Sequence, residues 1–197
     1  DREAKRAEVA AGLASFDVEF LQPSIVRRRA LVAQVDAGTI DQDDLPRDVL
    51  TTLMLHEDEL LLAPDVVLRE ICFFLLAGAH TSATAFVRTL HHVFAMAQDR
   101  PEDFELATTD LSFLQRCVHE TVRLQPSSPI AMRWALADVD LAGGVHVPTG
   151  ARLTIDLMAV NRDPEVFGDD ADAFDPHRVL GPGVAPWGLS FGLGMHA

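Results

Sequence analysis

One run of sequence, Pro64 to about Ala97, restricts the folds open to this chain because no proline follows its first residue. Proline suits the first turn of a helix, where its missing N–H has no intrahelical partner. Four positions inside the run follow the 3, 4 and 7 spacing of one helix face: Phe74, Ala77, Gly78 and Thr81. At about 1.5 Å per residue, such a helix would be about 50 Å long. The sequence therefore predicts one helix long enough to cross a domain.

The middle of this run, Ile71–Ala85, is apolar or small all around the helix, which predicts burial on every side. Gly78 costs about 1 kcal/mol relative to alanine in a helix interior. Thr81 carries a hydroxyl that is able to bond to a carbonyl of the preceding turn. A buried helix with a glycine and a hydroxyl at its centre predicts a ligand that passes close to the backbone. Tight packing of another helix against the small residue is the alternative, and these residues alone leave it open.

The composition is that of a soluble globular protein, with 197 residues, 48% hydrophobic and 23% charged. The formal net charge of -14 argues against nucleic acid and anionic membrane surfaces as partners. The longest uncharged apolar run is shorter than the roughly 20 residues that span a bilayer, and the charged first residues do not resemble a signal peptide. Cys72 and Cys117 lie in apolar helical segments, which predicts small buried thiols in a reducing compartment.

The other segments predict a mainly α chain with a small β region. Helices are expected at Asp1–Ala14, at Pro23–Ala37, from Pro46 to about Leu55 and at Leu111–Leu124. Between the last of these and the long helix, Gln98–Thr109 is polar and predicts a loop with one short helix at most.

Three short segments punctuated by glycine and proline predict strands: Met132–Leu136, Val145–Val147 and Arg152–Ile155. From Asn161 onward the chain is expected to be mostly irregular. A long stretch without helices or strands inside a compact domain usually has a functional reason.

Two short motifs suggest chemistry, although each is weak alone. Glu120 and Arg123 stand three residues apart on a predicted helix, where an exposed pair contributes only a few tenths of a kcal/mol. A zinc-binding His-Glu-x-x-His motif is excluded because Arg123 stands where the second histidine belongs. In Phe191–His196, Gly192 and Gly194 let backbone approach a flat ligand or adopt positive φ. No Lys-Ser/Thr follows, so this is not a phosphate-binding loop.

Taken in order, these motifs resemble those of the cytochrome P450 family of haem-thiolate monooxygenases. The family's distal helix carries Ala-Gly-x-x-Thr, and its next conserved helix carries Glu-x-x-Arg. Here these two motifs match Ala77–Thr81 and Glu120 with Arg123. The family then has an arginine in a strand, an Asn-Arg-Asp-Pro motif and a Phe-x-Pro-x-Arg motif, which match Arg133, Asn161–Pro164 and Phe174–Arg178. Its Phe-Gly-x-Gly-x-His-x-Cys loop is matched by Phe191–Ala197 up to the residue before the cysteine. The resemblance covers roughly Asp41 to the end.

The resemblance implies a partial P450 fold that runs from before the distal helix to the haem-binding loop. The expected parts are helices over 1–62, the central distal helix over 63–98, the Glu-x-x-Arg helix over 110–125, a small β region over 130–160, and the meander with the start of the haem-binding loop over 161–197.

The resemblance also implies haem b, whose iron would be held by a cysteine that the family pattern places directly after Ala197; no metal ligand is expected within this chain. Ala77 and Gly78 would lie against the haem, with a bend at Gly78. Thr81 would deliver protons to O2 together with His80, which stands where the family most often has an acid.

Further site residues follow from the same resemblance. Arg133 and His196 would pair the haem propionates. Phe191 would shield the thiolate, and Gly192 and Gly194 would let backbone N–H groups point at the sulfur.

A structural role is implied for Glu120, Arg123 and Arg178, which would form a buried ion network. The parent protein would hydroxylate a small organic substrate with O2 and electrons from NAD(P)H, delivered by a partner such as ferredoxin and ferredoxin reductase. It would be cytoplasmic, with an N-terminal anchor left open. The chain itself is expected to be a fragment, inactive without the cysteine ligand. The alternative is a non-catalytic, truncated or degenerate P450-fold protein with a binding or structural role.

Overall fold

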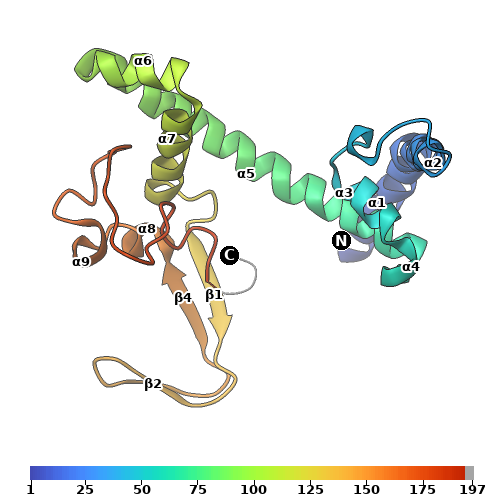
Figure 1. The fold of residues 1–197 in the computed structure, drawn as a ribbon. Helices are drawn as coiled ribbons and strands as arrows, with labels where there is room; N and C mark the ends of the chain where they lie inside the picture. The colour runs from blue at the N-terminus through green and yellow to red at the C-terminus, as the bar shows by residue number, and fades with distance from the viewer. Residues whose placement is uncertain (194–197) are drawn as a thin grey trace. The chain divides into compact units, whose positions relative to one another are not determined.

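A computed structural model describes residues 1–193, which divide into two compact units, the first ending at Gly78 and the second beginning at Ala79. The helix α5 (Pro64–Asp99) contributes residues to both units (Figure 1). The first unit also contains the helices that precede α5, which are α1 (Arg2–Phe16), the π-helix η1 (Asp17–Leu21), α2 (Gln22–Asp36), the 3-10 helix η2 (Gln42–Asp44), α3 (Val49–Leu55) and α4 (Glu57–Leu60).

The second unit contains the remaining helices and all the strands of the described residues. In chain order these are α6 (Pro101–Thr109), α7 (Leu111–Leu124), β1 (Ile130–Trp134), β2 (Val139–Leu141), β3 (Val145–Val147), β4 (Arg152–Asp156), α8 (Leu157–Val160) and α9 (Pro164–Phe167). The prediction of a mainly α chain with a small β region is therefore confirmed. The segment predicted as a loop with one short helix at most forms α6, which begins with a proline in its first turn.

The strands form two antiparallel pairs, β1 with β4 and β2 with β3. β1 starts and ends two residues earlier than predicted. β2 was not predicted because it is only three residues long and its apolar residues flank an aspartate. It pairs with β3 across a turn in which Gly143 and Gly144 have φ of +82° and +76°, a backbone region that favours glycine.

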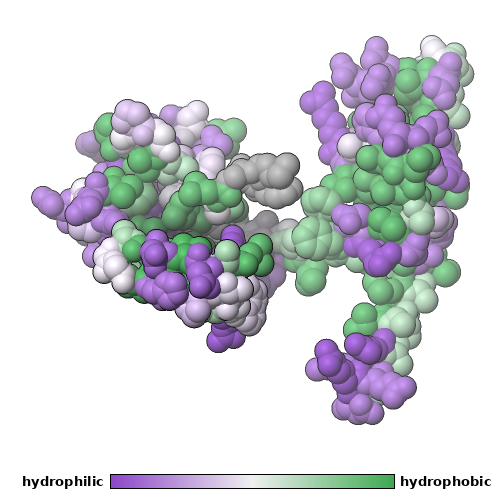
Figure 2. All heavy atoms as spheres, turned by 90° about the horizontal axis from the view of Figure 1, so that it is seen from below, coloured by the Kyte–Doolittle hydropathy of each residue, from purple (hydrophilic) through white to green (hydrophobic). Residues whose placement is uncertain are grey.

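The burial predicted for the middle of α5 is wrong. Residues 77–83 are all exposed, and Leu76 is 77% exposed. The buried residues of α5 are Thr89, Val93 and Met96, spaced four and three apart on one face. Exposed apolar side chains appear green in Figure 2. An apolar sequence predicts that a helix packs against other segments, but it does not identify those segments.

Two helical stretches, Arg2–Asp36 and Pro64–Asp99, are long and apolar enough to cross a membrane. The sequence expectation counted only the longest uncharged run. A membrane-spanning helix can contain one or two charged residues, so the length of an uncharged run is too strict a criterion for such a helix. The finding concerns length and composition only.

The core of the second unit joins the C-terminal part of α5 to α6 and α7. Its buried members are Val93, Met96, Ala107, Phe113 and Cys117. At the start of α7, the carboxylate of Asp110 accepts hydrogen bonds from the N–H groups of Ser112 (2.8 Å) and Phe113 (3.3 Å), a helix N-cap. The cap and the core together fix the helix that carries Glu120 and Arg123.

In the first unit, an ion pair joins α2 to the start of α3. Arg28 pairs through its Nη2 with Oδ2 of Asp48, and its Nε donates to Thr51 Oγ1 at 3.1 Å. Asp48 also caps α3 by accepting from the N–H of Thr51 at 2.8 Å. The hydrogen bond from Arg28 is the main reason why the pKa of Asp48 falls from 3.8 to about 2.

This lowered pKa predicts how the stability of the first unit depends on pH. The folded-state pKa lies below the unfolded one, so the contribution is present above pH 3.8 and is lost as the pH falls toward 2. Asp48→Asn should remove this contribution, so that wild type and variant converge in free energy of unfolding at low pH. Urea unfolding at several pH values measures the difference. The exposed Asp58→Asn is the control, and an equal pH slope for Asp48→Asn and wild type would contradict the prediction.

Candidate functional site

Arg123 of α7 has no exposed surface, and each of its donors is satisfied inside the second unit. Its Nε and Nη2 donate to the carboxylate of Glu120 at 2.7 and 2.6 Å. Its Nη1 donates to the carbonyls of Asn161 (2.6 Å) and Ala171 (2.7 Å), and Nη2 also donates to that of Ala173 (3.2 Å). Arginine carries five N–H groups, so these bonds use all of them. The Glu120–Arg123 ion pair is therefore buried, although a spacing of three residues on a helix would also allow an exposed pair.

Arg178 joins the same cluster from the irregular C-terminal segment. Its Nε donates to Glu120 Oε1 at 3.2 Å, and its Nη1 donates to Asp170 Oδ1 at 2.6 Å. The N–H of Asp175 also donates to Glu120 Oε1, at 3.1 Å. The hydrogen bond from Arg178 lowers the pKa of Asp170. The structure thus brings together Glu120, Arg123 and Arg178, the three residues for which the family resemblance implied an ion network.

Asn161 is a second buried centre, which the sequence named only as part of a motif. Its Nδ2 donates to the carbonyl of Arg123 (3.0 Å) and to Ser190 Oγ (2.9 Å). Its Oδ1 accepts from the N–H of Leu189 at 2.8 Å, and Ser190 Oγ donates to the carbonyl of Val122 at 2.8 Å. Asn161 therefore connects the end of α7 to the segment that leads into Phe191.

Gly188 adopts φ of +59°, and a Cβ added there would overlap the side-chain amide of Asn161. Only glycine lets the backbone pass this close to the amide. Two features of the sequence could have indicated this contact: Asn161 directly follows the apolar residues 157–160, and Gly188 lies three residues before Phe191.

A cavity of about 410 Å³ lies within the second unit, and we call it the α5–α7 cavity. Its lining residues are Thr81, Ser82, Ala85, Val118, Val122, Ser127, Ser128, Ser190 and Phe191. Ser127 Oγ donates to the carbonyl of Thr81 at 3.0 Å. Thr81 and Phe191, which are far apart in the sequence, therefore line the same cavity. The lining is apolar, small or hydroxyl-bearing and carries no charge, which suits a mostly apolar ligand that tolerates a few hydroxyl groups.

Among the residues that the structure describes, four further predicted site residues do not line this cavity: Ala77, Gly78, His80 and Arg133. Ala77 and Gly78 are exposed at the end of the first unit, and α5 stays α-helical through them. His80 is exposed on α5. Arg133 is exposed on β1, where its Nη1 donates to the carbonyl of Met132 at 2.9 Å.

Three predicted residues belong to the last loop. Gly192 has φ of +80°, the backbone region expected of a glycine in such a loop. Gly194 and His196 lie outside the described residues.

Neither cysteine has the surroundings of a metal ligand. Burial raises the pKa of the Cys117 thiol to about 11, which disfavours the thiolate that binds metals. Cys72 is half-buried in the first unit, and its pKa is also raised by burial. Neither lines the α5–α7 cavity, and residues 1–193 contain no group of three or more His, Cys, Asp or Glu placed to hold a metal.

Comparisons with known proteins assign this fold. The family model described as cytochrome P450 matches residues 96–194. Cytochrome P450 714C2 of Oryza sativa is 38% identical over 108 residues, which are 54% of this chain and 20% of the relative. Cytochrome P450 81D1 of Arabidopsis thaliana is 29% identical over 194 residues, 91% of this chain and 36% of the relative. The ligand-free P450 monooxygenase TamI superimposes with a TM-score of 0.63 at 26% identity, covering 98% of this chain and 41% of that one.

The chain belongs to the cytochrome P450 family, and its fold is part of the P450 fold. It spans between 20% and 38% of the length of the first curated relatives that it matches. The buried cluster around Arg123 and the α5–α7 cavity both lie in the second unit.

The Arg123 cluster generates a stability prediction. Arg123→Met should lower the free energy of unfolding by about 3–5 kcal/mol, because it leaves the carboxylate of Glu120 buried without its bidentate partner. Urea unfolding followed by circular dichroism measures this loss. Arg116→Met, at an exposed arginine of the same helix, should change it by less than about 1 kcal/mol. Equal losses for the two variants would contradict the prediction.

Proposed function

We propose that this chain is part of a haem-dependent monooxygenase, in which the α5–α7 cavity receives the haem. The observation that carries the proposal is that Thr81 of α5 and Phe191 of the last loop line one uncharged cavity. When bound, the haem would supply the iron at which O2 is activated, held by a cysteine thiolate that we place directly after Ala197.

Within this proposal, the residues that line the cavity have separate tasks. Val118 and Val122 give the cavity an apolar wall that disfavours water, which strengthens electrostatic interactions inside the site. Phe191 would shield the thiolate. Ser82 and Ala85 are small and let a flat ligand approach the helix. Their role is to shape the cavity rather than to react.

Proton delivery is assigned to Thr81 and His80. A hydroxyl on an uncharged wall accepts one hydrogen bond and donates another, so Thr81 is suited to hold a proton at a bound O2. A neutral imidazole carries both a hydrogen-bond donor and an acceptor, so His80 is suited to pass protons from solvent to Thr81. The exposure of His80 gives it access to that solvent.

The remaining predicted residues are assigned to haem binding. Arg133 and His196 would pair the haem propionates, and Ala77 with Gly78 would lie against the haem. Gly192 and Gly194 would direct backbone N–H groups toward the thiolate.

The proposed reaction is the hydroxylation of a small organic substrate with O2 and electrons from NAD(P)H. A ferredoxin with its reductase is the proposed electron donor, and the cytoplasm is the proposed location, with an N-terminal anchor left open. The formal charge of -14 argues against nucleic acid as a partner.

Haem binding is tested by titrating haem into this chain and into the chain completed from its gene. The completed chain should give the red-shifted Soret band of a thiolate-bound haem in the reduced carbon monoxide difference spectrum, and the present chain should not. If the completed chain binds no haem, the oxygenase proposal fails and a non-catalytic P450-fold protein is favoured.

The proton-relay role is tested in the completed enzyme. Thr81→Ala should uncouple NAD(P)H consumption from product formation and raise the yield of hydrogen peroxide, because the hydroxyl that holds the proton is lost. The matched control is Thr84→Ala, one turn along the helix, where the hydroxyl bonds to the carbonyl of His80 at 2.8 Å and does not line the cavity. Coupling in Thr81→Ala equal to that of Thr84→Ala would rule the role out.

A further inference from the structure

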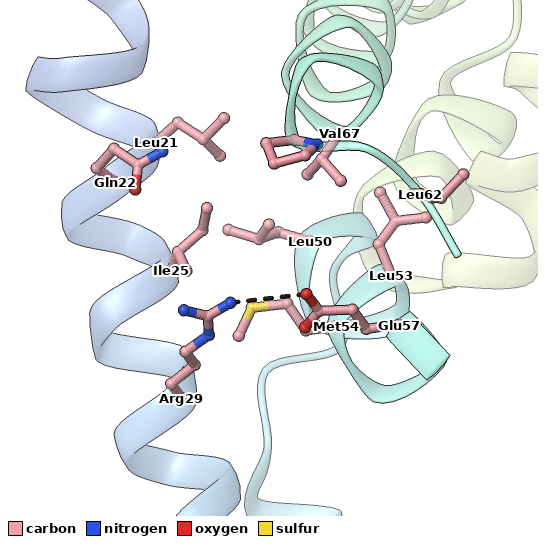
Figure 3. A pocket seen from close by; sticks show the side chains of 11 residues that line it. Leu21, Gln22, Ile25, Arg29, Leu50, Leu53, Met54, Glu57, Leu62 and Val67 are labelled. Atoms are coloured by element: carbon pink, nitrogen blue, oxygen red, sulfur yellow. Dashed lines mark ion pairs between the residues drawn. The ribbon is translucent and has the colours of Figure 1, made fainter. Parts of the chain in front are cut away.

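A second cavity, of about 280 Å³, lies entirely within the first unit (Figure 3). We call it the α2–α3 cavity after two of the elements that line it. Its lining residues are Leu21, Gln22, Ile25, Arg29, Leu50, Leu53, Met54, Glu57, Leu62, Pro64 and Val67. In Figure 3, Leu21 and Ile25 point across the cavity toward Leu50 and Val67. Eight of the eleven lining residues are apolar, and the side chains of Gln22, Arg29 and Glu57 add polar surface among them.

The polar groups at this cavity already have partners. Arg29 Nη2 and Glu57 Oε1 are 3.7 Å apart, and both side chains are more than half exposed, which places the pair at the mouth. Gln22 Nε2 donates to Asp17 Oδ1 at 2.9 Å. A water molecule inside a cavity needs two to four polar partners. The side chains of Leu50 and Val67 supply none, so water in this part of the cavity lacks side-chain partners.

The size and charge of the cavity define the ligand that fits. An apolar cavity of about 150 Å³ in another protein holds one benzene ring, so about 280 Å³ suits roughly two fused rings. The opposite charges of Arg29 and Glu57 cancel, so neither a cationic nor an anionic ligand is favoured. A single hydroxyl on the ligand can accept from Arg29 and donate to Glu57 at the mouth.

We propose that the α2–α3 cavity binds a neutral, mostly apolar molecule of about two fused rings that carries one hydroxyl at the Arg29–Glu57 pair. Its lining lies wholly in residues 21–67 of the first unit, whereas the α5–α7 cavity lies in the second. The site is therefore distinct from the proposed haem site and does not depend on the proposed function.

The test uses 2-naphthol as the probe and the 197-residue chain, with binding measured by isothermal titration calorimetry. Wild type should bind one equivalent with saturation. Ile25→Trp fills the cavity and should weaken binding at least tenfold. Val26→Trp adds the same bulk to the next residue, which is 67% exposed and does not line the cavity, and should leave binding unchanged. Absence of saturable binding to wild type, or equal affinity in the two variants, would overturn the proposal.

A second pair of variants covers the case in which Ile25→Trp does not fold. Leu53→Phe enlarges a lining residue of α3, whereas Leu55→Phe enlarges an exposed residue of the same helix outside this cavity. The first should weaken 2-naphthol binding at least fivefold and the second should not, with unchanged circular dichroism in both. Equal affinity of these two folded variants also overturns the proposal.

The role of the mouth is tested by comparing 2-naphthol with naphthalene. Wild type should bind 2-naphthol several-fold more tightly. Arg29→Met combined with Glu57→Gln should remove that preference and leave naphthalene binding unchanged. A preference that survives this double change would contradict the assignment of the hydroxyl to this pair.

Discussion

The second unit depends on the burial of one guanidinium. A charged group with no exposed surface is costly unless each of its donors is bonded, and Arg123 meets that requirement with Glu120 and with three backbone carbonyls between residues 161 and 173. Those carbonyls belong to a segment with little regular structure. Because the segment must pass through these positions to satisfy Arg123, the charge on α7 determines the path of the chain long after the helix has ended.

The same constraint extends to the candidate site. The carbonyl at Asn161 accepts from Arg123, while its side chain returns a hydrogen bond to the backbone of α7 and bonds Leu189 and Ser190. Ser190 and Phe191 then line the α5–α7 cavity together with residues of α5. A long irregular stretch is held in place here by buried polar contacts rather than by helices or strands, which explains why it persists inside a compact unit.

Local chemistry made much of the fold predictable, because caps, prolines and apolar spacing act over a few residues. The long helix α5 and the helix α7 follow from such signals, and the grouping of Glu120, Arg123 and Arg178 followed from a family resemblance rather than from spacing. The exposure of residues 77–83 was not predictable, because an apolar pattern does not show which segment packs against the helix. Asn161 was missed as a centre because its contacts reach residues 28–38 positions away. The α2–α3 cavity was missed because a void is a property of packing between segments.

The most direct test of Arg123 as the organising contact is native-state hydrogen exchange. The N–H groups of Asp175 and Leu189 lie in irregular segments and bond to Glu120 and Asn161 at 3.1 and 2.8 Å. If the buried cluster holds these segments to α7, both amides exchange only through the opening that also exposes the amides of α7, with the same free energy. Exchange of Asp175 and Leu189 at the rates of a free loop, while α7 stays protected, would show that the segments are held by something other than this cluster.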